Sequence, residues 1–122
     1  MHQFEKLKIW QKAMDIAEKI YTISAELPND EKFNLIHQIK KCAVSIPSNI
    51  AEGSGRNSKN EFVHFLGIAN GSSFELITQL ILLRRLKLIE EEKVTTVINE
   101  LMEVCNMSYA LQRNLKQTTA TS

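Results

Sequence analysis

The sequence predicts an all-α protein, folded as an antiparallel up-down-up-down four-helix bundle. Four successive segments repeat apolar residues at three- and four-residue steps, which is the period of an amphipathic helix. Glycine (4) and proline (2) are scarce in a chain of 122 residues, which argues against the many turns of an all-β fold. The length suits a single domain over residues 1–122, and short loops between long helices favour antiparallel neighbours.

The first helix is predicted over about residues 7–25. Its apolar stripe steps along one face through Trp10, Ala13, Ala17, Ile20 and Ser24. The run Leu27-Pro28-Asn29-Asp30 ends the pattern, because a proline disfavours helical backbone at the preceding residue and Asn and Asp suit turns.

The second helix is predicted over about residues 30–52, with Phe33 near its start. Its core stripe consists of Ile36, Ile39, Ala43, Ile46 and Ile50. Pro47 lies inside it and lacks an amide hydrogen, so we expect a kink or local break there. The run Gly53-Ser54-Gly55 should end the helix, with its glycines at positive φ angles.

The third helix is predicted over about residues 58–87, and it has the clearest start in the chain. Ser58-Lys59-Asn60-Glu61 matches a capping box, in which the serine hydroxyl accepts from the Glu61 amide. The apolar stripe that follows includes Phe65, Leu76 and Leu80.

The fourth helix is predicted over about residues 91–116, followed by a frayed polar tail from Gln117. Two adjacent apolar stripes on it indicate packing against more than one neighbour. The core predicted for the whole bundle includes residues from all four helices: Trp10, Ile20, Ile39, Ile46, Phe65, Leu76, Leu80, Leu101 and Val104.

Charge and composition exclude several classes of protein. The formal net charge is only +1, whereas nucleic-acid-binding domains often have a strongly basic composition. The charged start of the chain does not read as a signal peptide, and uncharged runs stop short of the ~20 residues of a membrane span. We therefore expect a cytoplasmic protein without membrane contact, with Cys42 and Cys105 as reduced, buried thiols.

No catalytic, metal or cofactor site is predicted. A di-iron bundle needs two Glu-x-x-His motifs, and only Glu61-x-x-His64 is present. Gly53-Ser54-Gly55-Arg56 lacks the Gly-Lys-Ser/Thr of a P-loop and does not follow a strand. An anion at the start of the third helix, beside Arg56, is a second interpretation of that loop.

Polar and small residues form two sets in the middle of the chain. One set lies along a flank of the second helix, and the other interrupts the third helix, where glycine costs helix stability. A satisfied internal network with close helix packing is one interpretation, and a subunit interface is the other. The residues predicted for either role are Gln38, Ser45, Asn49, Glu52, Gly67, Gly71, Ser72 and Glu75.

Basic residues are candidates for phosphate contact, although each is also consistent with a solvated surface. Lys40 and Lys41 are adjacent on the second helix, while Arg56 and Lys59 flank the loop before the third. Oligomerisation would repeat each small cluster into a ring of positive charge.

Three runs of residues resemble the bacterial four helix bundle protein family, whose members are often named after open reading frames in 23S ribosomal RNA intervening sequences. The resemblance covers about residues 4–115, with Lys40 and Lys41 where the family typically has arginine. The runs are Phe4-Glu5-x-Leu7-x-x-Trp10-Gln11-x-Ala13, Gln38-Ile39-Lys40-Lys41-x-x-x-Ser45-Ile46-x-x-Asn49-Ile50-Ala51-Glu52-Gly53 and Ala69-x-Gly71-Ser72-x-x-Glu75.

The resemblance implies a bundle that assembles as a ring-shaped homopentamer, and the family has no established catalytic activity. It also implies similarity to the accessory protein of diversity-generating retroelements, which binds nucleic acid and a reverse transcriptase. We therefore expect a non-enzymatic, oligomeric protein associated with RNA or DNA. The alternative is a protein–protein adaptor that makes no nucleic-acid contact.

Overall fold

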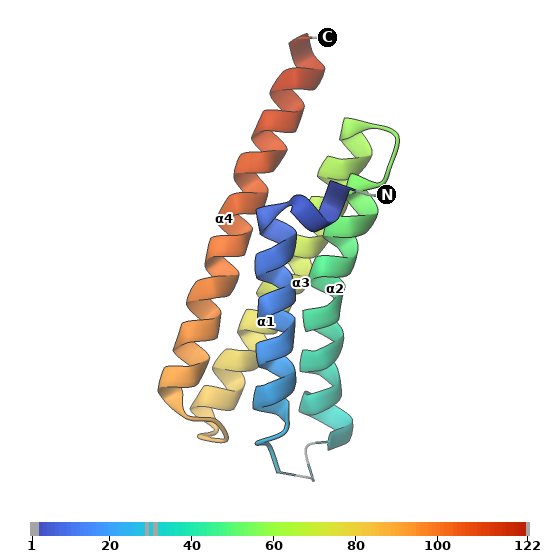
Figure 1. The fold of residues 1–122 in the computed structure, drawn as a ribbon. Helices are drawn as coiled ribbons and strands as arrows, with labels where there is room; N and C mark the ends of the chain where they lie inside the picture. Colours follow the sequence, from blue (N-terminus) through green and yellow to red (C-terminus); the bar gives the residue numbers. More distant parts are fainter. Residues whose placement is uncertain (1–2, 29, 31, 122) are drawn as a thin grey trace.

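The computed structural model describes residues 3–28, 30 and 32–121, and every secondary-structure element within them is a helix (Figure 1). A short 3-10 helix, η1 (Gln3–Lys6), leads into α1 (Lys8–Ser24). A π-helical turn, η3 (Lys32–Ile36), leads into α2 (His37–Ser54), and α3 (Lys59–Arg85) and α4 (Glu91–Thr121) follow. Each helix runs antiparallel to the next, so the predicted all-α four-helix bundle is confirmed.

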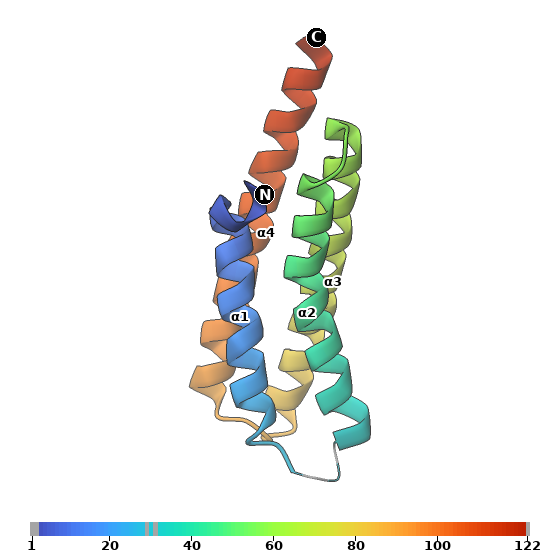
Figure 2. The same ribbon diagram turned by 45° about the vertical axis from the view of Figure 1, so that its right-hand side comes forward.

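The four helices pack unequally. Figure 2 shows α2 beside α3 on one side of the bundle and α1 beside α4 on the other. Of the four neighbouring pairs of long helices, α2–α3 is in the most extensive contact and α1–α4 in the least. The hydrophobic core draws on every helix, and its largest fully buried side chains include Ile20, Ile39, Leu76 and Leu101.

Two residues of the predicted core, Trp10 and Phe65, are only half-buried, so that part of the prediction is wrong. Trp10 stacks on Phe4 at the outside of the bundle, with ring centroids 5.1 Å apart. The Arg56 guanidinium lies over the Phe65 ring, with its Cζ atom 4.8 Å from the centroid of that ring. Each ring therefore covers a seam between elements instead of filling the centre. The other seven predicted core residues are buried.

The ends of α2 differ from the prediction. α2 begins at His37, after the π-helical turn, and continues to Ser54, while the side chain of Phe33 is outside the described part of the structure. Pro47 does not interrupt the helix. The described glycines all have negative φ, so the expected positive φ angles at Gly53 and Gly55 are absent.

Gly53 lets the end of α2 pack closely on α3 because glycine has no side chain. A Cβ atom placed on it would lie 2.7 Å from the Cβ of Phe65 and 3.0 Å from Cδ1 of Phe62. The end of α2 therefore approaches α3 more closely than any other residue would allow.

The start of α3 follows the capping box. The Ser58 hydroxyl accepts a hydrogen bond from the Glu61 amide at 3.1 Å, and Ser58 has extended backbone. This bond satisfies one of the amide donors that a helix start leaves unpaired.

The end of α3 is a Schellman motif with lysine in the left-handed position. The Leu88 amide donates to the Leu83 carbonyl at 3.1 Å, and the Lys87 amide donates to the Arg84 carbonyl at 3.1 Å. Lys87 has φ 58°, and it is the non-glycine residue at positive φ in the described chain. Glycine is the usual residue here because a Cβ atom strains this conformation.

The fourth helix is longer than predicted. It continues to Thr121, so the residues from Gln117 onward extend the helix instead of forming a frayed tail. Figure 1 shows its last turns rising beyond the α2–α3 loop. The sequence of α4 contains no glycine or proline that would end the helix, since the last proline is Pro47 and the last glycine is Gly71. The helix propensity of its residues therefore extends α4 past its last core residue.

The composition of α3 differs from the expectation that no segment is apolar enough to span a membrane. By length and composition alone this helix is apolar enough to cross a membrane, and 44% of its most apolar window is buried inside the bundle. Its apolar character therefore exceeds what the core of the single chain uses.

We predict that Gly53→Ala destabilises the protein by about 1–3 kcal/mol, because the added methyl group overpacks the contact with Phe62 and Phe65. Urea unfolding followed by circular dichroism measures the change. Gly67→Ala is the matched control, since a Cβ there lies more than 4 Å from the surrounding described atoms and alanine favours helix. Equal loss of stability in both variants would contradict the steric explanation.

We predict that Lys87→Gly stabilises the protein by about 1 kcal/mol, because glycine removes the strain at φ 58°. The midpoint of thermal unfolding should rise. Lys87→Ala removes the same charge but keeps the Cβ atom, so it should bring no such gain. If alanine stabilises as much as glycine, the charge of Lys87 and not its backbone is responsible.

Candidate interaction surfaces

The structure brings part of the predicted polar set together along the α2–α3 seam. The hydroxyls of Ser45 and Ser72 lie 2.8 Å apart, and Asn49 donates to the Ser45 carbonyl at 2.8 Å and to its hydroxyl at 3.0 Å. Gln38 and Glu75 are exposed, and Glu75 interacts with Cys42. The hydrogen bonds among Ser45, Asn49 and Ser72 form an interhelical network that aligns two antiparallel helices.

Both cysteines are free and buried, as the sequence predicts. Burial, followed by hydrogen bonding to and repulsion from Glu75, raises the pKa of Cys42 to about 11. Burial likewise raises the pKa of Cys105 above its usual value. Both thiols therefore stay protonated near neutral pH, whereas the reactive form of cysteine is the thiolate.

Gly67 and Gly71 face open space. Each is exposed, and a Cβ atom on either would meet no atom of a described residue within 4 Å. Neither glycine therefore permits a close approach between helices of this chain. Three large apolar side chains of α3 also have high exposed fractions: Ile68 39%, Phe74 43% and Leu82 44%.

The buried side chain of Asn70 lies one turn from both Gly67 and Phe74 on α3. Neither its amide nitrogen nor its amide oxygen has a hydrogen-bond partner among the described residues. A buried amide is normally paired, because leaving it unpaired costs free energy. The sequence offers no signal for this feature, since asparagine in a mixed stripe usually indicates exposure.

The four predicted phosphate-contacting residues do not form one cluster. Lys40 lies over the Tyr21 ring, 4.9 Å from its centroid, and the adjacent Lys41 is exposed on a different side of α2. Arg56 pairs with Glu52 at 2.8 Å and with Glu61 at 3.7 Å. Lys59 is exposed at the start of α3. Glu52 is thus engaged with Arg56 and not with the serines of the seam.

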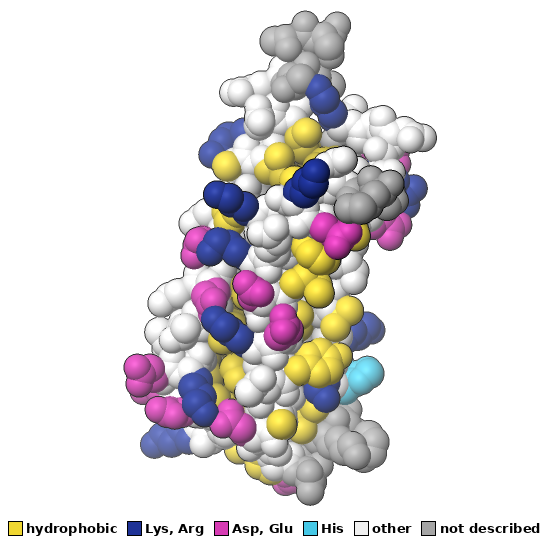
Figure 3. All heavy atoms as spheres, viewed as in Figure 1, with side chains coloured by type: hydrophobic (Ala, Val, Ile, Leu, Met, Phe, Trp, Pro, Cys, Tyr) yellow, Lys and Arg dark blue, Asp and Glu magenta, His cyan; other side chains and the backbone are white. Residues whose placement is uncertain are grey.

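One end of the bundle is basic, which sequence reasoning missed. This basic end consists of η1, the start of α1, the α2–α3 loop and the last turns of α4, and α4 has no acidic residue after Glu103. Figure 3 shows lysine and arginine side chains gathered over the upper part of α1 and α4. Its basic residues that form no ion pair with described residues are Lys6, Lys8, Lys59, Arg113 and Lys116.

The signal for this end lies in two separate parts of the sequence. Lys6 and Lys8 are at the beginning of the chain, and Arg113 and Lys116 are near its end. Only the antiparallel order of the helices brings these segments to the same end of the bundle.

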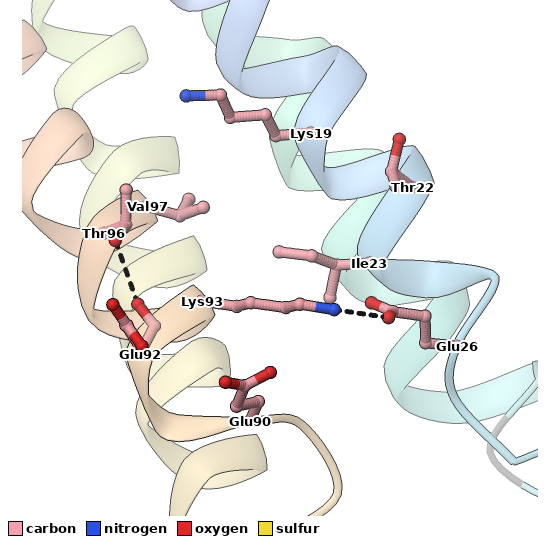
Figure 4. Close-up of a pocket in the computed structure, with 9 residues that line it drawn as sticks. All are labelled: Lys19, Thr22, Ile23, Glu26, Glu90, Glu92, Lys93, Thr96 and Val97. Atoms are coloured by element: carbon pink, nitrogen blue, oxygen red, sulfur yellow. Dashed lines mark hydrogen bonds and ion pairs between the residues drawn. The ribbon is translucent and has the colours of Figure 1, made fainter.

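A cavity of about 490 Å³ lies between α1 and α4 at the opposite end, with Ile23 and Val97 among its apolar lining (Figure 4). Lys93 reaches across it to Glu26 at 2.7 Å, and this contact raises the pKa of the lysine. Lys19 likewise pairs with Glu100 on α4 at 2.6 Å. These ion pairs connect α1 and α4, the neighbouring helices with the least extensive contact.

The described residues contain no group of three or more His, Cys, Asp or Glu side chains that could hold a metal ion. Glu61 of the single Glu-x-x-His motif is occupied at the cap of α3 and in the contact with Arg56.

Comparison with known proteins adds a family to this geometry. A solved structure from Bacteroides thetaiotaomicron, described as a protein with unknown function from the S23 ribosomal protein family, is 27% identical. Its TM-score is 0.80, and the match covers 85% of this chain and 97% of that one. No curated protein is significantly similar. The family model of the 23S rRNA-intervening sequence protein matches residues 5–110, so the chain belongs to that family.

Proposed function

We propose that the protein is a non-enzymatic, homo-oligomeric scaffold that binds RNA through the basic end of its bundle. The observation that carries this proposal is the concentration there of lysine and arginine side chains, most of which form no ion pair with the residues that the structure describes. Such residues neutralise phosphates without sequence preference, because they contact the backbone and not the bases.

Assembly would multiply a charge that is small in one chain. Each chain has a formal net charge of +1, so a monomer attracts nucleic acid weakly as a whole. A ring with cyclic symmetry places the same end of every subunit on one rim. The basic ends would then form a continuous positive rim, and the family resemblance favours five copies.

The family supports RNA over DNA as the ligand. The matching family is described as the 23S rRNA-intervening sequence protein, and the similar solved structure is assigned to the S23 ribosomal protein family. A ribosomal RNA or its precursor is therefore the first RNA ligand to test.

A protein–protein adaptor without nucleic-acid contact is the alternative function. It is favoured by the exposed apolar side chains on α3, which exceed the needs of the monomer's own core. The two functions differ in whether the purified protein retains RNA in a salt-dependent way.

We predict that Arg113→Gln with Lys116→Gln weakens binding of a labelled single-stranded RNA and lowers its dependence on salt. Losing two phosphate contacts should reduce the slope of log affinity against log salt by about 1.4. Fluorescence anisotropy over a salt series measures both quantities. Arg85→Gln with Lys87→Gln removes two charges from the opposite end and is the matched control, which should bind like the natural protein.

Two results would count against the RNA proposal. A natural protein that retains neither RNA nor DNA at low ionic strength supports the adaptor instead. An equal loss of affinity in the control would mean that total charge, and not the basic end, determines binding.

A further inference from the structure

A groove with an apolar lining runs along the outside of the bundle between α1 and α2. We call it the α1–α2 groove, and its volume of about 350 Å³ is near the lower end of the range for small-ligand pockets. Figure 3 shows hydrophobic side chains forming a band along this face. The apolar residues that line the groove include Phe4, Trp10, Met14, Val44, Pro47 and Ala51.

Two stacked aromatic rings line one end of this groove. The ring centroids of Phe4 and Trp10 are 5.1 Å apart, and their planes are 16° from parallel. Both side chains are half-buried, so the pair is held against the bundle and still reaches solvent. A flat aromatic ligand can extend such a stack, because aromatic rings attract one another in offset stacked arrangements.

The aromatic end of the groove belongs to the basic end of the bundle. Phe4 is in η1, and Trp10 is in the first turn of α1. Lys6 and Lys8 are in the same stretch of chain, and both are exposed and form no ion pair with described residues. A ligand that has both phosphates and flat rings would therefore use both features at once, and nucleic acid is such a ligand.

The charges along the groove itself are of mixed sign. By their spacing from the lining residues, Glu5, Glu18 and Glu52 lie as near to it as Lys40 and Lys41 do. The groove therefore does not select an anion. A nucleobase is uncharged, so it can enter a groove of mixed charge while the phosphates of its chain stay at the basic end.

An unpaired base is the form of nucleic acid that this arrangement fits. In a duplex the bases are stacked on each other, whereas a single strand or a loop exposes base faces that stack on aromatic side chains. Such stacking is worth a substantial part of single-strand affinity, and it accepts every base because every base has a π face. It would thus add affinity without adding sequence preference.

We propose that an unpaired base of a single-stranded RNA stacks on the Phe4–Trp10 pair in the α1–α2 groove. This inference rests on the proposed function and narrows its ligand to RNA that is single-stranded or looped. An apolar protein segment is the rival occupant of the groove. It is less favoured, because it would make no use of the unpaired lysines in the same stretch of chain.

The fluorescence of Trp10 tests the contact in the natural protein, because the chain has one tryptophan. Three probes of equal length are titrated: a single-stranded RNA, the same RNA in a duplex, and an abasic strand that keeps the phosphates. The single strand should quench the indole fluorescence in step with its binding. The duplex and the abasic strand should bind the basic end without quenching.

Two variants measure the contribution of stacking to affinity. Trp10→Leu removes the ring and keeps an apolar side chain, so affinity for the single strand should fall by at least about fivefold. The slope of log affinity against log salt should stay unchanged, because no phosphate contact is lost. Tyr109→Leu is the control, since it removes an exposed ring from α4, one turn before Arg113, and leaves the groove intact. Circular dichroism verifies that both variants are folded.

Each contrary outcome has a distinct meaning. A natural protein that binds no RNA overturns both this site and the proposed function. RNA binding without quenching of Trp10 overturns the base site alone and leaves the groove to an apolar protein partner. Equal quenching by the abasic strand, or equal loss of affinity in Tyr109→Leu, also overturns it. If Trp10→Leu does not fold, the titrations of the natural protein decide.

Discussion

The close approach of α2 to α3 at Gly53 is the constraint on which the rest of the bundle depends. A residue without a side chain there brings the end of α2 against Phe62 and Phe65. With that end fixed, hydrogen bonding between Ser45 and Ser72 and the interaction of Cys42 with Glu75 occur in antiparallel order along the same seam. The register of this pair then determines which side of α3 faces outward.

Much of the fold follows from the periodicity of the sequence. The apolar stripes predict four helices and most of the core, and the Ser58 capping box locates the start of α3. The errors occur where tertiary contacts compete with local pattern. Trp10 and Phe65 are large apolar residues at core spacing, yet each covers a seam, and the glycine at position 53 is needed for packing and not for a turn.

The candidate surfaces are less accessible from sequence than the helices. Spacing places Gln38, Ser45, Asn49, Ser72 and Glu75 on predictable helix flanks, but it cannot say which flanks meet. The same limit applies to Gly67 and Gly71, because a helix with apolar residues all round has no obvious outer face. The basic end was missed because its charges come from both ends of the chain, whereas the totals alone suggest neutrality.

The ion pairs between α1 and α4 have a consequence for how the bundle opens. This pair has the least extensive packing of any two neighbouring long helices, and it is bridged by exposed contacts from Lys12 to Glu103, Lys19 to Glu100 and Lys93 to Glu26. Exposed ion pairs add little stability and are screened by dissolved ions. Amide hydrogens of α1 should therefore exchange with solvent through a partial opening that leaves the α2–α3 hairpin closed, and rising ionic strength should make that opening more frequent.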